Sequence, residues 1–235
     1  MSQYRQSPFA NLTPVVKNLL IINILFFVAT YVLANTFDMT RWLSVFYFDS
    51  PFFRPWQIIT YMFMHANLGH IFFNMFALFM FGPILEYSLG SKKFFNFYFA
   101  CGIGAIVLQM LVQAFEVYHI TGAITIAHAQ FQPSAEQYEK LKEIYTEPVL
   151  GASGAIFGIL VAFGVLYPNM ELMIMFIPIP VKAKYLVSVY VLYEIYSAIA
   201  PAVGDNVAHL AHLGGALFGF LLIKLWGIKG TNNFL

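Results

Sequence analysis

The sequence predicts an all-α membrane protein built as a bundle of six transmembrane helices. Of its 235 residues 60% are hydrophobic and only 10% are charged. A soluble core of this size does not need so many apolar residues, and six apolar stretches approach the length of a membrane span. We expect a single membrane domain over residues 1–235, with a cytoplasmic segment at 1–15, a core at 55–226 and an outer-loop insertion at 116–148.

The first apolar stretch has about 20 residues, enough to cross the ~30 Å hydrocarbon layer. It is longer than the apolar region of a secretory signal and lacks a clear small-residue cleavage site, so we expect a retained helix. The second stretch carries four polar residues in its first half, which weakens the prediction of its start. The six spans are expected near residues 16–35, 58–86, 93–115, 150–167, 184–201 and 206–226.

Lysine and arginine are unevenly divided between the two sides of this predicted bundle. Of the 12 basic residues, four lie on the outer side, namely Arg41, Arg54, Lys140 and Lys142. The remaining eight lie on the inner side, so the positive-inside rule places both termini in the cytoplasm. We expect a multi-pass protein of the bacterial plasma membrane.

The longest outer loop, 116–148, contains the beginning of a helix. Ser134 can cap that helix, and Gln137 can bond back to the backbone of Ser134. Apolar residues at helical spacing then predict a short amphipathic helix on the outer membrane surface, while a solvated loop is the alternative. These residues are Tyr138, Leu141, Ile144 and Tyr145.

The apolar stretch 167–184 is interrupted by Pro168, Pro178 and Pro180. It is too short and too broken for two further crossings, so we expect an inner loop lying against the membrane. Other classes are disfavoured by composition. A net charge of +1 does not suit nucleic-acid binding, and the lone Cys101 forms no intrachain disulfide. We expect no cofactor.

Ser153 is the first residue that indicates chemistry. It lies in Gly151-Ala152-Ser153-Gly154, at the start of the fourth span. A serine in the first helical turn lies beside free backbone N–H groups and the positive end of the helix dipole, which favour a developing oxyanion. In the structural interpretation Ser153 only bonds a backbone carbonyl, and Gly151 and Gly154 only allow close packing.

His212 in the sixth span is the candidate base for Ser153. With a helix start near residue 206, His212 lies about 9 Å along the helix, at 1.5 Å per residue. The fourth and sixth spans run in the same direction, so both side chains are at a similar shallow depth. Gly215 and Gly219 follow on the face of His212 and permit close packing. A buried structural histidine is the alternative, but an unpaired imidazole in lipid is costly.

His70 and Asn74 are four residues apart on one face of the second span. Together with the backbone N–H of Ser153 they would form an oxyanion hole, in which each strong donor contributes about 3–4 kcal/mol. The alternative is that both side chains hold neighbouring helices together.

A metal centre at His65, His70, His209 and His212 is the alternative interpretation of these histidines. No HExxH motif is present and we expect no carboxylate among them, so no metal is predicted. Two acids fall inside predicted spans. Glu86, at the inner end of the second span, is interpreted as structural. Glu194, near the middle of the fifth, is expected to be neutral or paired, with a partner that the sequence does not identify.

These motifs together resemble those of the rhomboid family of intramembrane serine proteases. The resemblance extends from about residue 55 onward. It includes Pro55-Trp56, the segment from Met64-His65 to Asn74, Gly82-x-x-x-Glu86-x-x-x-Gly90, Gly151-x-Ser153-Gly154 and Ala211-His212-x-x-Gly215-x-x-x-Gly219. The fold it implies is a rhomboid-like bundle.

The resemblance implies Ser153 as nucleophile and His212 as general base, without a carboxylate third member. It also implies the oxyanion hole named above, transmembrane protein substrates, and a lateral gate made by the fifth span and the last outer loop. The first outer loop, 38–54, would lie partly in the bilayer.

Two residues depart from the family pattern. Phe157 stands where some members have a tyrosine, but its ring can still pack on His212. Arg41-Trp42 reverses the order of a loop motif in which Trp precedes Arg.

Two other functions were considered. One is a rhomboid-like protein that binds membrane clients without cleaving them, but such proteins lack the serine or the histidine. The other is a proton-coupled transporter built on the buried histidines and Glu194, for which inverted repeats would be expected, and none is seen. The sequence does not indicate an oligomeric state.

Overall fold

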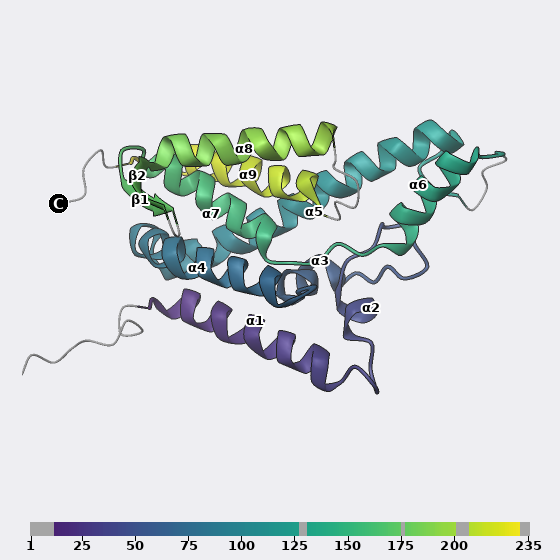
Figure 1. Cartoon of the computed structure of the whole chain (residues 1–235), viewed down its shortest axis with the longest axis horizontal. Helices are drawn as coiled ribbons and strands as arrows, with labels where there is room; N and C mark the ends of the chain where they lie inside the picture. The colour runs from purple at the N-terminus through teal and green to yellow at the C-terminus, as the bar shows by residue number, and fades with distance from the viewer. Residues whose placement is uncertain (1–11, 127–130, 175–176, 201–206, 231–235) are drawn as a thin grey trace, which may run out of the picture.

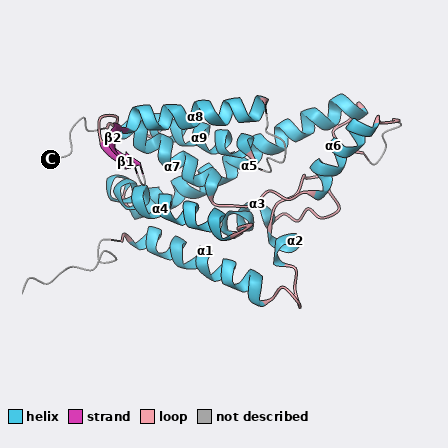
Figure 2. Cartoon of the chain, in the orientation of Figure 1, coloured by secondary structure: helices cyan, strands magenta, loops and turns pink. Residues whose placement is uncertain are grey.

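The computed structural model describes residues 12–126, 131–174, 177–200 and 207–230. Over these ranges the regular elements are helices apart from one short hairpin, and loops connect them (Figure 1; coloured by secondary structure in Figure 2). In chain order the elements are α1 Pro14–Val32, α2 Met39–Leu43, α3 Gln57–Thr60, the 3-10 helix η2 Tyr61–Phe63, α4 Leu68–Leu89, α5 Ser91–Thr121, α6 Ala135–Thr146, α7 Ser153–Leu166, β1 Glu171–Ile174, β2 Ile177–Lys182, α8 Ala183–Ile199 and α9 His209–Leu225.

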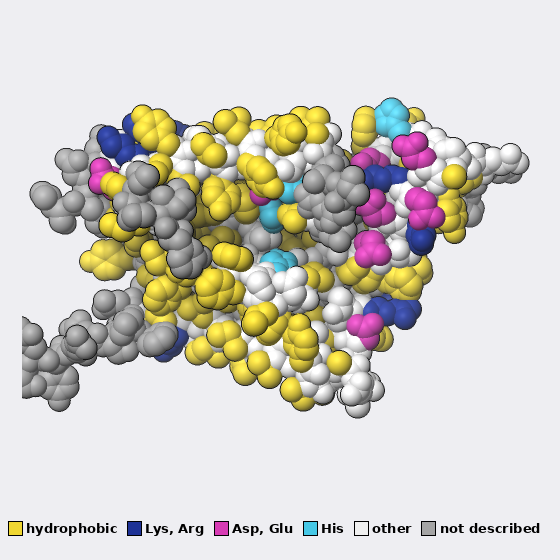
Figure 3. Space-filling model, viewed as in Figure 1, with side chains coloured by type: hydrophobic (Ala, Val, Ile, Leu, Met, Phe, Trp, Pro, Cys, Tyr) yellow, Lys and Arg dark blue, Asp and Glu magenta, His cyan; other side chains and the backbone are white. Residues whose placement is uncertain are grey.

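Three helices, α1, α4 and α5, are long and apolar enough to cross a membrane. The apolar helices α7 and α9 have 14 and 17 residues. At 1.5 Å per residue, α7 covers only about 21 Å of a ~30 Å hydrocarbon layer. In Figure 3 apolar side chains cover the middle of the visible face, whereas most acidic ones gather near α6. An integral membrane protein is confirmed, and six complete crossings stay a prediction.

The core lies where α5, α7 and α9 pack against one another and against α4. Large aromatic side chains fill it, since Phe94 and Phe97 of α5 and Phe163 of α7 are fully buried. Ile159 of α7 is buried in the same cluster. Helix α7 is therefore enclosed by protein along much of its length, and Ser153 at its first turn is held by this packing.

Glu86 near the end of α4 caps the N-terminus of α1. Its carboxylate oxygens accept hydrogen bonds from the backbone N–H groups of Val15 at 3.1 Å and Val16 at 2.9 Å, and from the Ser91 hydroxyl at 2.6 Å. A carboxylate at a helix N-terminus satisfies free donors and faces the positive end of the dipole. Glu86 is thus a structural residue, as the sequence indicated.

The second predicted span is interrupted. We expected one helix over 58–86, but α3 and η2 end at Phe63 and α4 begins at Leu68. The Asn67 side chain accepts a hydrogen bond from the backbone N–H of His70 at 2.9 Å and caps α4. Because asparagine competes for backbone donors in this way, it favours a new helix start over a continuous helix.

The segment 167–184, which we expected to be an inner loop, contains an antiparallel hairpin, so the fold is not purely α-helical. β1 pairs with β2 in a register that matches Glu171 with Lys182 and Met173 with Pro180. Proline lacks a backbone donor, but a two-stranded ribbon has free edges at which no donor is required. The prolines therefore disfavour additional membrane-spanning helices in this segment but are compatible with the β1–β2 hairpin.

The helix predicted after Ser134 is present as α6, with Ser134 and Gln137 forming the reciprocal capping box, and its place on the outer membrane surface stays a prediction. Leu141, Ile144 and Tyr145 are buried, whereas Tyr138, which we expected on the same face, is 57% exposed. The buried face packs against the protein itself, mainly Tyr47 and Val117.

The first outer loop is tied to α6 and to the segment before α7. The hydroxyl of Tyr145 donates to Asp49 at 2.7 Å, and Val45 pairs with Val149 through two backbone hydrogen bonds. Burial and the adjacent Asp49 carboxylate raise the pKa of Tyr47 to about 12 and raise the pKa of Tyr145, so both hydroxyls stay protonated donors. The loop is thus fixed from both sides.

Candidate active site

Ser153 is the first residue of α7. The turn before it depends on Gly151, whose φ of +130° is strained for any residue with a side chain. A Cβ atom at Gly151 would also lie 2.8 Å from His70 Nε2 and 3.5 Å from Ser153 Oγ. The backbone at Gly151 therefore lies close to both His70 and Ser153. The free backbone N–H groups in the first turn of α7 lie beside the Ser153 hydroxyl.

His212 of α9 lies directly beside Ser153. Its Nε2 is 2.8 Å from Ser153 Oγ, which is hydrogen-bond distance. Its ring stacks on Phe157, one turn after the serine, with centroids 4.4 Å apart and planes 9° apart. Since α9 begins at His209 and not near residue 206, His212 is in the first helical turn and closer to the helix start than expected.

Close contact of α7 with α9 brings the serine and the imidazole together. A Cβ atom at Gly215 would lie 1.8 Å from the carbonyl oxygen of Gly154, and one at Gly219 would lie 2.6 Å from that of Gly158. Only glycine fits where two backbones approach so closely. Gly215 and Gly219, the glycines predicted to permit close packing of the sixth span, therefore form the contact of α9 with α7.

Asn74 is buried on α4, and its Nδ2 has no hydrogen-bond partner among the described residues. His70, one turn earlier, has Nε2 near Gly151, while the backbone N–H of Ala66 lies 3.4 Å from its Nδ1. An unpaired buried donor is rare in proteins, and a functional site is one of the places where it occurs.

Glu194 corrects two expectations, because we expected no carboxylate among the histidines and no third member beside His212. Its Oε2 lies 3.0 Å from His212 Nδ1 and 2.6 Å from His209 Nδ1. Sequence analysis identified this acid but not its partners. A lone acid within a membrane helix is costly, so Glu194 alone indicates that a partner exists on a neighbouring helix. The sequence does not indicate which residue that partner is.

The same three residues could also hold a metal ion, because their donor atoms all lie within 4.8 Å of one another. Two histidines and one glutamate are a donor set that zinc accepts. The distances from Glu194 to the two imidazoles are, however, ordinary hydrogen-bond lengths.

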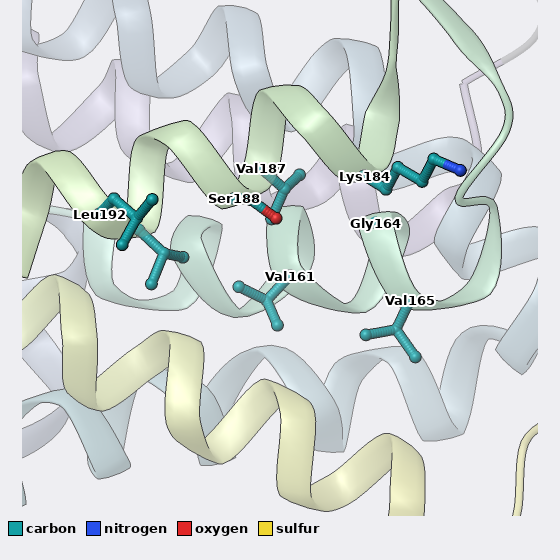
Figure 4. A pocket seen from close by; sticks show the side chains of 8 residues that line it. Val161, Gly164, Val165, Lys184, Val187, Ser188 and Leu192 are labelled. Atoms are coloured by element: carbon teal, nitrogen blue, oxygen red, sulfur yellow. The ribbon is translucent and has the colours of Figure 1, made fainter.

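A separate apolar groove of about 510 Å³ lies between α7 and α8. Val161 and Val165 line it from α7, and Val187, Ser188 and Leu192 from α8 (Figure 4). Val161 is eight residues beyond Ser153, about 12 Å along the helix. The groove is thus away from the reacting pair. Of the expected gate, α8 is described, whereas the last outer loop at 201–206 lies outside the described residues.

A family model for the Rhomboid domain matches residues 53–228, about three quarters of the chain. The chain belongs to the rhomboid family. This match covers α3 to α9 and so includes every residue of the candidate site.

Several other rhomboid proteins are similar to this chain. Rhomboid protein 1, mitochondrial, of Saccharomyces cerevisiae is 29% identical over 70% of this chain and 40% of the yeast protein. Putative rhomboid protease YdcA of Bacillus subtilis is 26% identical over 71% of this chain and 65% of its own length. Rhomboid protease AarA of Providencia stuartii is 29% identical over 71% of this chain and 54% of its own length. The chain thus spans about half the length of these rhomboid relatives.

Proposed function

We propose that this rhomboid protein is an intramembrane serine protease that hydrolyses peptide bonds in transmembrane segments of other membrane proteins. The observation that carries the proposal is the 2.8 Å distance from His212 Nε2 to Ser153 Oγ, at the first turn of an apolar helix. A base at hydrogen-bond distance from a hydroxyl is the arrangement that activates a serine nucleophile. Two of the three relatives named above carry the word protease in their names.

In the proposed reaction Ser153 Oγ attacks the carbonyl carbon of the scissile bond while His212 Nε2 takes the hydroxyl proton. His212 then gives that proton to the leaving amine as the C–N bond breaks. Water, activated by the same imidazole, releases the acyl group from Ser153 and restores the hydroxyl.

Stabilisation of the tetrahedral oxyanion is assigned to three donors. These are the backbone N–H of Ser153 and the side chains of His70 and Asn74. The unpaired Nδ2 of Asn74 supports this role, because the group has a hydrogen bond to gain when an oxyanion forms. The position of His70 Nε2 beside the Gly151 turn supports it as well.

Substrates would be membrane-spanning segments that unwind near the outer face of the bilayer, because a helical peptide bond is shielded by its own turn. We therefore propose segments with Gly, Pro or Ala there, cut after a small residue. They would enter past α8 as a lateral gate, as the family resemblance implies.

The proposed topology is six spans with both termini in the cytoplasm. The relatives include mitochondrial proteins and bacterial ones, so they do not favour the expected bacterial plasma membrane over an organelle membrane. The proposal therefore concerns the orientation in the membrane and not the compartment.

The test is cleavage of a panel of single-span test proteins by the full chain reconstituted in liposomes. Ser153→Ala and His212→Ala are each expected to lower cleavage by roughly 10³-fold or more, without loss of folding. A fluorophosphonate should label the unmodified protein and Ser188→Ala, which removes an exposed hydroxyl on α8, but not Ser153→Ala. Unchanged cleavage by Ser153→Ala refutes the assignment, and the absence of both labelling and cleavage favours a non-catalytic client-binding protein.

A further inference from the structure

Glu194 is a buried acid in α8, a helix whose other charged side chain is Lys184. Its neighbours along α8, Tyr193 and Ile195, are 57% and 41% exposed on the outer surface of the bundle, whereas Glu194 is 4% exposed. The carboxylate faces α9, where both of its bonds are made. Burying an acid in this environment is costly, so its position indicates a function or a strong structural need.

The two bonds of Glu194 define the orientation of the imidazole. A carboxylate only accepts hydrogen bonds, so Nδ1 of His212 carries the hydrogen in the 3.0 Å contact. Nε2 of the neutral ring then has its lone pair free, and this atom lies 2.8 Å from Ser153 Oγ. That tautomer can accept the serine proton, whereas the other would direct an N–H at the hydroxyl.

His209 extends the same arrangement. Its Nδ1 lies 2.6 Å from the carboxylate oxygen that also contacts His212. By donating to Glu194 it disperses part of the negative charge and holds the carboxylate toward α9. The groups thus form a chain across three helices, from Ser153 of α7 through His212 of α9 to Glu194 of α8 and back to His209.

We propose that Glu194 is a positioning residue that completes a Ser153–His212–Glu194 triad, with His209 holding Glu194 in place. The proposal rests on the proposed protease function. Glu194 fixes the reactive tautomer of His212 and stabilises the imidazolium that forms when the ring takes the serine proton. In a site with little water the attraction between these charges is screened weakly, so it contributes more than it would in water.

This role differs from two others that the same contacts would allow. If Glu194 only joined α8 to α9, its loss would lower stability and leave the chemical step of folded protein unchanged. If the three residues instead held a metal ion, His212 Nδ1 would be a ligand and activity would depend on that metal.

Glu194→Gln and Glu194→Leu are the test variants, measured in liposomes beside the unmodified protein. The glutamine removes the charge and the leucine also removes the acceptor. Because replacing the triad carboxylate by an amide costs about 10⁴-fold in a Ser-His-Asp enzyme, kcat is expected to fall roughly 10²–10⁴-fold in both variants, with KM nearly unchanged. The rate of fluorophosphonate labelling at Ser153 should fall in parallel.

Glu86→Gln is the matched control, since Glu86 is also a buried, hydrogen-bonded acid but lies at the α1 cap. Its thermal midpoint should fall while kcat of the folded protein stays unchanged. His209→Gln should lower kcat less than Glu194→Leu.

A spectroscopic readout is independent of turnover. The ¹⁵N shifts of His212, assigned by comparison with His212→Gln, should show hydrogen on Nδ1 in the unmodified protein and a shift toward hydrogen on Nε2 in Glu194→Leu.

The outcomes separate the two proposals. Retention of kcat and labelling rate in Glu194→Leu, with Ser153→Ala inactive, overturns the triad and leaves the protease assignment standing. Loss of activity on chelation, restored by Zn²⁺, also overturns it. Undiminished cleavage by Ser153→Ala removes both proposals.

Discussion

Several polar side chains of the candidate site form hydrogen bonds to a residue on another helix. Ser153 contacts His212, and His212 contacts Glu194. A polar group that faces lipid has no water with which to form hydrogen bonds, so an unpaired one is costly. Hydrogen bonds between polar side chains of neighbouring helices avoid this cost. Asn74 differs from these residues, because its buried Nδ2 has no partner among the described residues.

Replacement of that amide tests the oxyanion assignment. Asn74→Ala is expected to lower kcat by roughly 10²–10³-fold with little change in KM, because the lost donor would act on the oxyanion and not on the substrate. The thermal midpoint should change little, since Nδ2 makes no bond in the described structure. Kinetics on a single-span test protein and thermal unfolding in detergent measure the two effects.

Asn23 on α1 provides the control. It is buried, as Asn74 is, but its Nδ2 already donates to the Leu19 carbonyl at 2.7 Å. Asn23→Ala should lower the thermal midpoint and leave kcat unchanged. A full kcat in Asn74→Ala would contradict the oxyanion role.

At the scale of elements, the contact between α7 and α9 sets the distance on which the proposed chemistry depends. Gly215 lies one turn after His212, and Gly154 follows Ser153, so their contact is next to the reacting pair. Any change in helix separation there moves the imidazole relative to the hydroxyl. The small residues of both helices are thus part of the site geometry.

Gly215→Ala tests this dependence. The added methyl group would meet the Gly154 carbonyl at 1.8 Å, so α9 must move away from α7. Overpacking of this kind costs about 1–3 kcal/mol of stability, and a shift near 1 Å can cost roughly 10²-fold in rate. We expect a lower thermal midpoint together with reduced kcat and slower fluorophosphonate labelling.

Leu217→Ala is the control on the same helix, because Leu217 is 47% exposed on the outer surface. It should keep both the labelling rate and kcat. Full activity of Gly215→Ala would show that the backbone contact does not govern the pair.

At the scale of the whole molecule, apolar side chains cover the middle of the face seen in Figure 3, and most charged side chains on that face lie toward its two ends. The charges near α6 include the pairs of Lys140 with Glu116 and of Lys142 with Glu139. Exposed ion pairs of this kind contribute little to stability, but they favour water over lipid. The end of the bundle with α6 is therefore expected outside the membrane.

The predicted topology can be measured by cysteine labelling, since the native Cys101 is fully buried. Glu139→Cys on α6 and Lys92→Cys at the start of α5 both replace exposed residues. A membrane-impermeant maleimide added to intact cells should label the first variant and not the second. Inverted vesicles should give the opposite pattern, and labelling of both variants from one side would contradict the orientation.

Local patterns account for much of the fold and of the proposed site. The long apolar helices follow from uninterrupted hydrophobic length, and α6 follows from the capping box at Ser134 and Gln137. Ser153 and His212 were found because glycine-rich motifs surround them. In each case the signal lies within a few residues along the chain, so no knowledge of the packing was required.

The tertiary structure decided which groups meet across helices. The β1–β2 hairpin, the short α7 and the partners of Glu194 were not predicted, because they depend on how one helix is rotated and shifted against the next. Apolar periodicity limits those angles only loosely in a helix that is hydrophobic on every side. The sequence alone therefore determined where the membrane helices and the candidate serine and histidine lie, and only the packing of α8 on α9 decided that a carboxylate joins them.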